Sequence, residues 1–171
     1  MEVAVCRWLS GQSALSGGKT GRNPTDRGKP GTKKSIVVEA DGGPLGIVIA
    51  PANVHDTKCL EETLEAIVVE RPEEPVQHLC LDKGYDNPTG RKAAENADYR
   101  HHIRRIGEEK PKTTKRRYKA RRWVVERTIS WLQKCRAILV RYDKNAQNYL
   151  GLLQLACALL WFRRLHRLRA F

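Results

Sequence analysis

The sequence has no apolar run long enough to cross a membrane. Its longest such run, residues 149–162, contains Gly151 and Gln154 and falls short of the roughly 18 to 20 residues that a spanning helix needs. We expect this run to form a buried helix instead. Arg7 interrupts the one early apolar stretch, so no leader for secretion is predicted. The protein is therefore expected to act in the cytoplasm, with no membrane partner.

The cysteines show no metal-binding or disulfide pattern. There are 5 of them, with no Cys-x-x-Cys pair and no histidine at the spacing of a zinc ligand. Neither a structural zinc site nor a disulfide framework is predicted. Cysteines set within apolar patterns are more often small buried hydrophobes in a reducing compartment, which agrees with a cytoplasmic protein.

Carboxylates are scarce where the chain is most basic. Between Lys110 and Asp143 the one acid is Glu126, set among many lysines and arginines. A surface ion pair with Arg122 would explain it, contributing roughly a few tenths of a kcal/mol. The alternative is a metal ligand at a place where a polyanion docks. The formal net charge of +13 and the pI near 9.9 favour nucleic acid as the partner over an anionic membrane surface.

The pattern of apolar residues predicts a single α/β fold, a mixed sheet flanked by helices. Residues 10–34 are rich in Gly, Ser, Pro and Lys and are expected to form a loop. Strands are expected at residues 1–9, 35–40, 45–50, 76–81 and 99–106. Helices are expected from an Asp56 cap for about three turns, then at about 87–97, 119–140 and 145–169. The third of these helices is expected to bury Val125, Ile129, Leu132 and Leu139.

Two acids are candidates for chemistry. Asp82 follows the predicted strand over 76–81, where loops commonly place reactive groups, although an aspartate there is more often a turn or cap residue. Glu126 lies on the basic helix, which could pack across the same sheet. Together the two carboxylates could hold a divalent metal ion. Phosphoryl transfer on nucleic acid uses such carboxylates to place two metals about 3.5 to 4 Å apart.

Four motifs occur in order along the chain. They are residues 17–28 (GGKTGRNPTDRG), 52–56 (ANVHD), 81–85 (LDKGY) and 122–132 (RWVVERTISWL). Together they resemble the DDE-class transposases of bacterial insertion sequences, family five, over about residues 17–160. The resemblance implies an RNase H-like fold over residues 35–171, with residues 1–34 supplying a degenerate first strand and a basic loop.

The resemblance also implies DNA transposition, in which the enzyme cleaves and joins element ends and target DNA with Mg²⁺ or Mn²⁺. Asp82 would be the second catalytic aspartate and Glu126 the catalytic glutamate, both of them metal ligands. A homo-oligomer would assemble the DNA ends. Arg122 and Glu126 match the family's signature around the glutamate, whereas Tyr118 is one place away from its tyrosine position and Gln133 stands where a lysine is common.

The chain departs from the family at its start. The first aspartate of such transposases would fall near Trp8, and no aspartate precedes Asp26. The helical DNA-binding segment that usually comes before the catalytic domain is not seen either. The family's first aspartate is expected to bridge both metals, so we expect this polypeptide alone to hold at most one ion poorly and to show little or no strand transfer. An upstream-frame product could supply the missing acid.

No other acid is predicted to replace the missing one. Asp41 is expected in a hairpin turn, Asp56 at a helix start and Asp86 near a helix cap, while Asp26 lies in the basic loop beside Arg27. Each of these positions has an ordinary structural explanation.

The basic residues around the glutamate are expected to contact the phosphate backbone of DNA. These candidates are Lys115, Arg116, Arg117, Lys119, Arg121, Arg122, Arg127 and Lys134. Trp123 and Trp131 could stack on a base, although core packing is favoured for both. The histidines His55, His101 and His102 could contact phosphate or metal, but solvated polar roles are more common.

Three functions compete. The chain is the catalytic segment of a DDE transposase, or a non-catalytic DNA-binding remnant that inhibits a full-length transposase. A basic RNA-binding protein of ribosomal type would explain the charge but leaves the ordered motifs unexplained.

Overall fold

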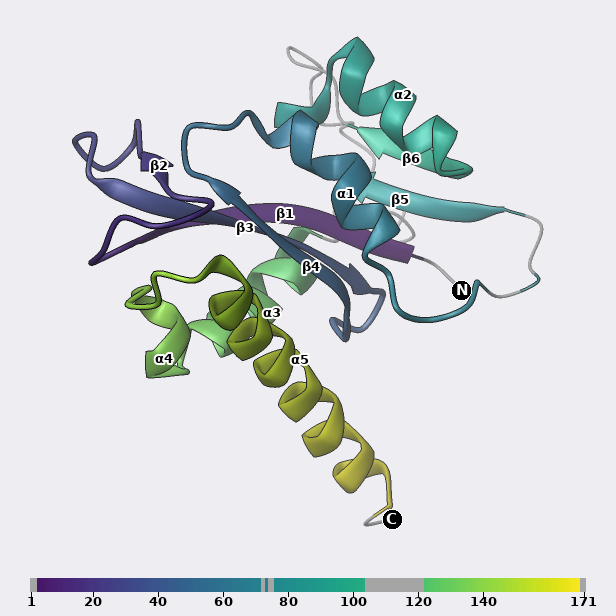
Figure 1. The fold of residues 1–171 in the computed structure, drawn as a ribbon. Coiled ribbons are helices and arrows are strands. Elements are labelled where there is room, and N and C mark those ends of the chain that lie inside the picture. Colours follow the sequence, from purple (N-terminus) through teal and green to yellow (C-terminus); the bar gives the residue numbers. More distant parts are fainter. Residues whose placement is uncertain (1–2, 72, 74–75, 104–121, 170–171) are drawn as a thin grey trace.

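The computed structural model describes residues 3–71, 73, 76–103 and 122–169. Its centre is a six-stranded mixed sheet (Figure 1). Strands β1 (Val3–Gln12), β3 (Pro30–Glu39) and β4 (Pro44–Pro51) pair antiparallel, and the short β2 (Gly21–Arg22) pairs with the start of β3. On the other side of β1, strands β5 (Gln77–Leu81) and β6 (Tyr99–Ile103) extend the sheet in parallel. The predicted mixed sheet is confirmed.

Helices cover both faces of the sheet (Figure 1). One face carries α1 (Leu60–Glu65) and α2 (Pro88–Asn96), together with the 3-10 turns η1 (Asp56–Cys59) and η2 (Lys83–Tyr85). The other face carries α3 (Arg122–Gln133), α4 (Arg136–Leu139) and α5 (Ala146–Arg169). Strand β3 contributes side chains to both hydrophobic cores, because Ile36 and Val38 pack under α3 and α5 while Val37 packs on the opposite side. A strand buried on both faces reads as a continuous apolar run.

The predicted loop over residues 10–34 is wrong at both of its ends. Strand β1 continues to Gln12 and β3 begins at Pro30, and the two remain paired along this extra length. Backbone pairing there is supported by buried polar side chains, including Thr32, which donates to the carbonyl of Lys19. Strands from residues 1–34 and from residues 35–171 therefore share one sheet. The domain boundary between these two segments stays a prediction.

The helix predicted to start at Asp56 is also different. His55 is the N-cap of η1, where its Nδ1 accepts from the Thr57 amide, and Asp56 instead forms an ion pair with Lys33. Only α1, residues 60–65, is α-helical in this region. By contrast, the predicted Asn87 cap of α2 is confirmed, because its side chain accepts from the Gly90 amide.

The long helix predicted over 119–140 is broken in the described part of the chain. Helix α3 ends at Gln133 and α4 begins at Arg136, with Cys135 in extended conformation between them. This break turns Leu139 outward, where it is 47% exposed, and places Ile138 in the core instead. The predicted burial of Val125, Ile129 and Leu132 is confirmed.

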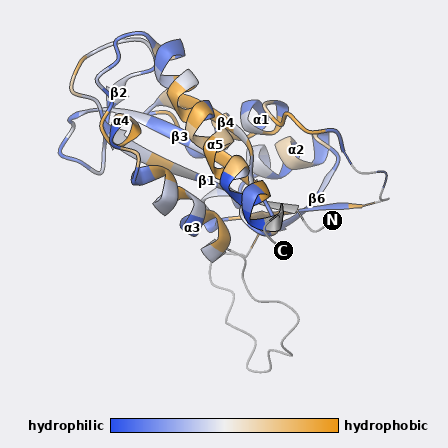
Figure 2. Cartoon of the chain, turned by 90° about the horizontal axis from the view of Figure 1, so that it is seen from below, coloured by the Kyte–Doolittle hydropathy of each residue, from blue (hydrophilic) through white to orange (hydrophobic). Residues whose placement is uncertain are grey.

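Helix α5 was expected to be buried, and this is wrong for one of its faces. Tyr149 and Leu153 are buried, but Leu155, Leu159 and Phe162 are exposed, and Figure 2 shows apolar residues along this helix. Within the described residues, no helix combines the length and the apolarity needed to cross a membrane. The apolar face of α5 therefore lies partly on the protein surface.

A buried arginine fastens the segment after α4 to the sheet. Arg141 is 1% exposed, and its guanidinium donates to the Thr32 hydroxyl and to the carbonyls of Asp143 and Lys144 at 2.8 to 3.1 Å. The ring of Tyr149 lies beneath it. With the Thr20 hydroxyl at 3.3 Å, four neutral oxygen acceptors and one aromatic face surround this buried cation, in place of the carboxylate that a buried cation usually has.

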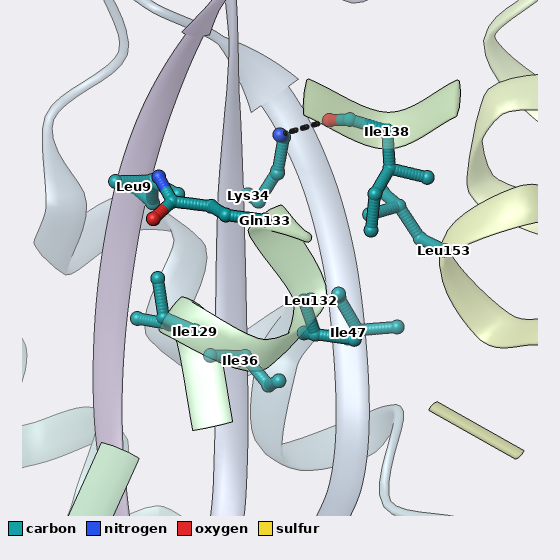
Figure 3. Close-up of a pocket in the computed structure, with 9 residues that line it drawn as sticks. All are labelled: Leu9, Lys34, Ile36, Ile47, Ile129, Leu132, Gln133, Ile138 and Leu153. Carbon is teal, nitrogen blue, oxygen red and sulfur yellow. Dashed lines mark hydrogen bonds between the residues drawn. The ribbon is translucent and has the colours of Figure 1, made fainter. Parts of the chain in front are cut away.

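A lysine lies beside a small apolar cavity of about 20 Å³ between β3, α3 and α5 (Figure 3). Lys34 is 7% exposed, and its Nζ donates to the Ile138 carbonyl at 2.6 Å. Burial lowers the pKa of Lys34 from 10.5 to about 8. Since the unfolded chain holds the proton more tightly, stability rises with pH between about 8 and 10.5. Below pH 8, burying the charge costs up to about 3 kcal/mol.

We expect Lys34→Met to stabilise the protein at pH 7 by about 1 to 3 kcal/mol, because it keeps the apolar contacts and removes a buried charge. The Ile138 carbonyl stays satisfied, since Tyr149 also donates to it. Urea unfolding at pH 7 and pH 10 measures the effect, which should shrink at the higher pH. The exposed Lys29→Met is the control. A Lys34→Met protein that is less stable than wild type at pH 7 would contradict this account.

Candidate active site

Strand register places an arginine beside Asp82. In the parallel pairing of β1 with β5, Cys6 lies opposite Leu81, so the next residues of the two strands, Arg7 and Asp82, come side by side. Asp82 follows directly on the end of β5, as predicted. The centre of β1 and the end of β5 therefore meet at one point of the sheet.

The face toward which Asp82 points follows from the alternation of β5. Leu79 and Leu81 pack in the core under α1 and α2, whereas Cys80 packs against the core under α3 and α5. Successive side chains of a strand point to opposite faces, and Asp82 keeps an extended backbone with φ −72° and ψ 162°. Asp82 therefore faces the side of the sheet that α3 covers, the side on which Glu126 lies.

Arg7 links this point of the sheet to α3. Its guanidinium donates to Glu126 Oε1 in an ion pair, although 119 residues separate the two in sequence. The side chain of Arg7 is 26% exposed and that of Glu126 is 46% exposed. The pair is thus open to solvent and partly screened. The local pair of Glu126 with Arg122 remains a prediction, because the side chain of Arg122 lies outside the description.

Asp82 also has a structural role of the kind considered for it. Its Oδ1 accepts from the Lys83 amide at 2.8 Å and caps η2. A cap and a metal ligand are compatible, because a carboxylate has two oxygens and about four lone-pair sites. Neither role excludes the other.

The residues present do not fit a metal centre of the two-ion kind. In the described ranges no cluster of three or more His, Cys, Asp or Glu side chains is arranged to hold an ion. The Arg7 guanidinium is a positive charge that contacts one of the two predicted ligands. It lies beside the position of the other ligand. A divalent cation would be repelled by this charge and would have to compete with it for Glu126.

The other acids considered as substitutes lie in local interactions. Asp26 accepts from the Gln12 side chain at 2.9 Å, and Asp86 pairs with Arg91 on α2. Asp41 lies in the turn between β3 and β4, 3.5 Å from Arg164. None of these contacts involves Arg7 or Glu126.

Most of the predicted DNA-binding residues fall outside the described chain. These are Lys115, Arg116, Arg117, Lys119 and Arg121, while Arg122 is described by its backbone alone. Lys134 is exposed just after α3. Arg127 donates to the Asp41 carbonyl and stacks on Trp123 at 4.8 Å. Of the predicted DNA-binding residues, Arg127 on α3 and Lys134 just after it are therefore the two whose side chains the structure describes.

The aromatic residues of α3 are more exposed than expected. Trp123 is 52% and Trp131 36% exposed, so the favoured core placement is wrong for both. The histidines have local partners instead of forming one site. His78 and His102 stack, with ring nitrogens 2.6 Å apart, and His101 lies 3.3 Å from an Arg91 nitrogen.

The contact between Arg7 and Glu126 is not apparent from the sequence. The sequence predicts the missing aspartate near Trp8, one residue along, and Arg7 only interrupts an apolar segment there. A charged residue inside an otherwise apolar strand is the one local signal that could have drawn attention to it.

Comparison with known proteins identifies the family of this chain. Residues 9–161 match the family described as transposase DDE domain. A protein assigned as the transposase for insertion sequence element IS402 of Burkholderia cepacia is 36% identical over 160 residues, which cover 87% of this chain and 71% of that protein. The fold and these matches define an insertion-sequence transposase of the DDE type. This chain belongs to the DDE transposase domain family.

Proposed function

We propose that this chain is the RNase H-like catalytic domain of a DDE transposase that binds DNA but is impaired in cleaving it. The observation that carries this proposal is the position of Arg7, which lies beside Asp82 and pairs with Glu126 on one face of the sheet. The strand order β4-β3-β1-β5-β6, antiparallel and then parallel, is the arrangement expected of an RNase H-like fold and supports the classification.

In the proposed site, Asp82 and Glu126 have the positions of the family's second and third acids. Arg7 lies one residue from the position near Trp8 where the family's first aspartate is expected, and it contacts Glu126. Its guanidinium neutralises Glu126 and puts a positive charge between the two carboxylates. Members of this family typically use divalent metal ions, whose role is to clamp the attacking and leaving oxygens. With arginine here, the site has one carboxylate ligand fewer, and the guanidinium competes with a metal ion for Glu126. Cleavage of a DNA strand is therefore impaired.

DNA binding does not need this centre. The net charge of +13 and the exposed basic side chains provide phosphate contacts that neutralise DNA without reading its sequence. Such contacts release counterions, so each adds about 0.9 to the slope of log affinity against log salt. We therefore expect weak binding of duplex DNA with steep salt dependence.

The test of DNA binding measures fluorescence anisotropy of labelled duplex DNA between 50 and 200 mM salt, a range over which about six or more phosphate contacts weaken binding by about 10³-fold. Lys134→Gln is expected to lower the slope by about 1, whereas Lys92→Gln, on the exposed surface of α2, leaves it unchanged. Wild-type binding that is absent, or that ignores salt, would overturn the proposed function.

The alternative function is a DNA-binding remnant that inhibits a full-length transposase, and the Arg7–Glu126 pair also favours it. Cleavage of DNA that contains element ends separates the two. Metal-dependent cleavage that disappears in Asp82→Asn and in Glu126→Gln supports a catalytic segment. Salt-sensitive binding without cleavage, unaffected by either substitution, supports the remnant.

A further inference from the structure

A second cavity lies away from Arg7, where the turn between β3 and β4 meets α3 and α5. It has a volume of about 210 Å³, tenfold larger than the cavity beside Lys34. Its lining combines backbone of the turn, residues 41–44, with side chains of both helices. We call it the α3–α5 pocket. Figure 1 shows the two helices on the same side of the sheet.

The walls of the α3–α5 pocket are held by specific contacts. Trp161 donates from its indole nitrogen to the Pro44 carbonyl at 2.7 Å, and Thr128 donates to the Gly42 carbonyl at 2.6 Å. Gly42 has a φ of 94°, and a Cβ added at Gly43 would overlap the Trp161 ring. The glycines let the turn approach both helices closely. The turn that forms one wall of the pocket is therefore fixed to both helices.

The charge of the pocket suits an anion. Four arginines line it, and Asp41 is the one acid among its lining residues. The arginines are Arg127, Arg163, Arg164 and Arg167. Arg164 is occupied by Glu39 and Asp41, and Arg127 donates to the Asp41 carbonyl. In the described part of the chain, neither Arg163 nor Arg167 forms an ion pair with a carboxylate, so two guanidinium groups are left to bind an outside anion.

The pocket also offers an aromatic surface. Trp131 and Trp161 line it, and Trp131 is 36% exposed. The Arg167 guanidinium lies over the Trp131 ring, 5.7 Å from its centroid. An indole beside an arginine provides both a stacking plane and a cation for one ligand.

We propose that the α3–α5 pocket binds an unpaired nucleotide of DNA. Its base stacks on Trp131, and its phosphate contacts Arg163 and Arg167. The location is compatible with this ligand, because Glu126 of the candidate active site and Arg127 of the pocket lie on the same turn of α3, with side chains about 100° apart around its axis. A DNA strand following that helix could reach both. This inference rests on the proposed function, since it takes DNA as the partner.

The experiment compares two labelled duplexes of equal base-paired length, one blunt and one with a short 3′ overhang of thymidines. Wild type is expected to bind the overhang duplex about fivefold or more tightly, the effect of stacking one base on an aromatic side chain. The double variant Arg163→Gln/Arg167→Gln and the single variant Trp131→Leu should lose this preference. Lys58→Gln/Lys92→Gln removes the same charge from exposed positions on the α1 and α2 side and should keep it.

The outcomes separate this inference from the proposed function. The pocket proposal is overturned if wild type binds the two duplexes equally. It is also overturned if the pocket variants and the control variant lose the overhang preference equally. In either case, binding of the blunt duplex still supports DNA as the partner. Failure of wild type to bind either duplex overturns the proposed function itself. Analytical ultracentrifugation tests whether a second copy of this chain occupies the pocket instead. Pocket variants that no longer dimerise but retain the overhang preference would show that it does. That result would overturn the nucleotide assignment.

Discussion

Arg7→Asp is expected to create divalent-cation binding where the wild-type chain has little or none. The substitution removes the guanidinium that pairs with Glu126 and adds a carboxylate next to Asp82 in the strand register. Three acids would then face one point from β1, β5 and α3. Sites of this kind, exposed and built from few carboxylates, bind divalent ions with Kd values of about 10⁻⁴ to 10⁻³ M. Isothermal titration with Mn²⁺ measures the gain directly, independently of any DNA reaction.

Two further variants show whether the new carboxylate acts as a ligand. Arg7→Gln removes the positive charge without adding an oxygen anion, so its affinity for Mn²⁺ should lie between those of wild type and Arg7→Asp. The double variant Arg7→Asp/Asp82→Asn should lose most of the gain. Wild type that binds Mn²⁺ as tightly as Arg7→Asp would refute the idea that Arg7 blocks the site, as would full binding by the double variant.

Arg141→Met is expected to destabilise the fold by about 2 to 4 kcal/mol, because it removes the donor of four hydrogen bonds. The buried Thr32 hydroxyl and the part-buried carbonyls of Asp143 and Lys144 would lose their donor. Each unsatisfied buried acceptor costs about 1 to 3 kcal/mol. Denaturant unfolding monitored by circular dichroism measures the loss.

A matched control for Arg141→Met exists in the same part of the chain. Arg136 is exposed on α4, and replacing it by methionine changes the charge equally while leaving no buried acceptor. Its effect should stay within about 0.5 kcal/mol. If both variants unfold at the same denaturant concentration, the hydrogen bonds of Arg141 contribute nothing to stability and the account of this buried arginine is wrong.

Elements with strong local signals could be predicted well. The hairpin of β3 and β4 follows from β-branched runs around a Gly-Gly turn, and α2 follows from the cap and first-turn proline at Asn87 and Pro88. Asp82 lies at the strand end where the apolar run stops. In each case the deciding interactions lie within a few residues, so periodicity and capping rules are sufficient.

Elements decided by distant partners could not be predicted. The chain from Gly31 to Lys34 looks like polar loop, yet it is a strand because β1 and β4 pair with it from both sides. His55 takes the cap that suited Asp56, since Lys33, from a different strand, holds the Asp56 carboxylate. Trp123 and Trp131 lie at the surface because Val124, Val125 and Ile129 face the core between them.

The sequence by itself determined the family, the two candidate acids and the basic charge around one of them, because these depend on residue identity and order. Tertiary structure alone decided that Arg7 lies beside Asp82 and pairs with Glu126, and that arginines of α3 and α5 surround one cavity. The physical reason is register. Burial of apolar faces on both sides of the sheet fixes the register of the strands and the positions of the helices on them. This register brings together side chains that no local sequence pattern connects.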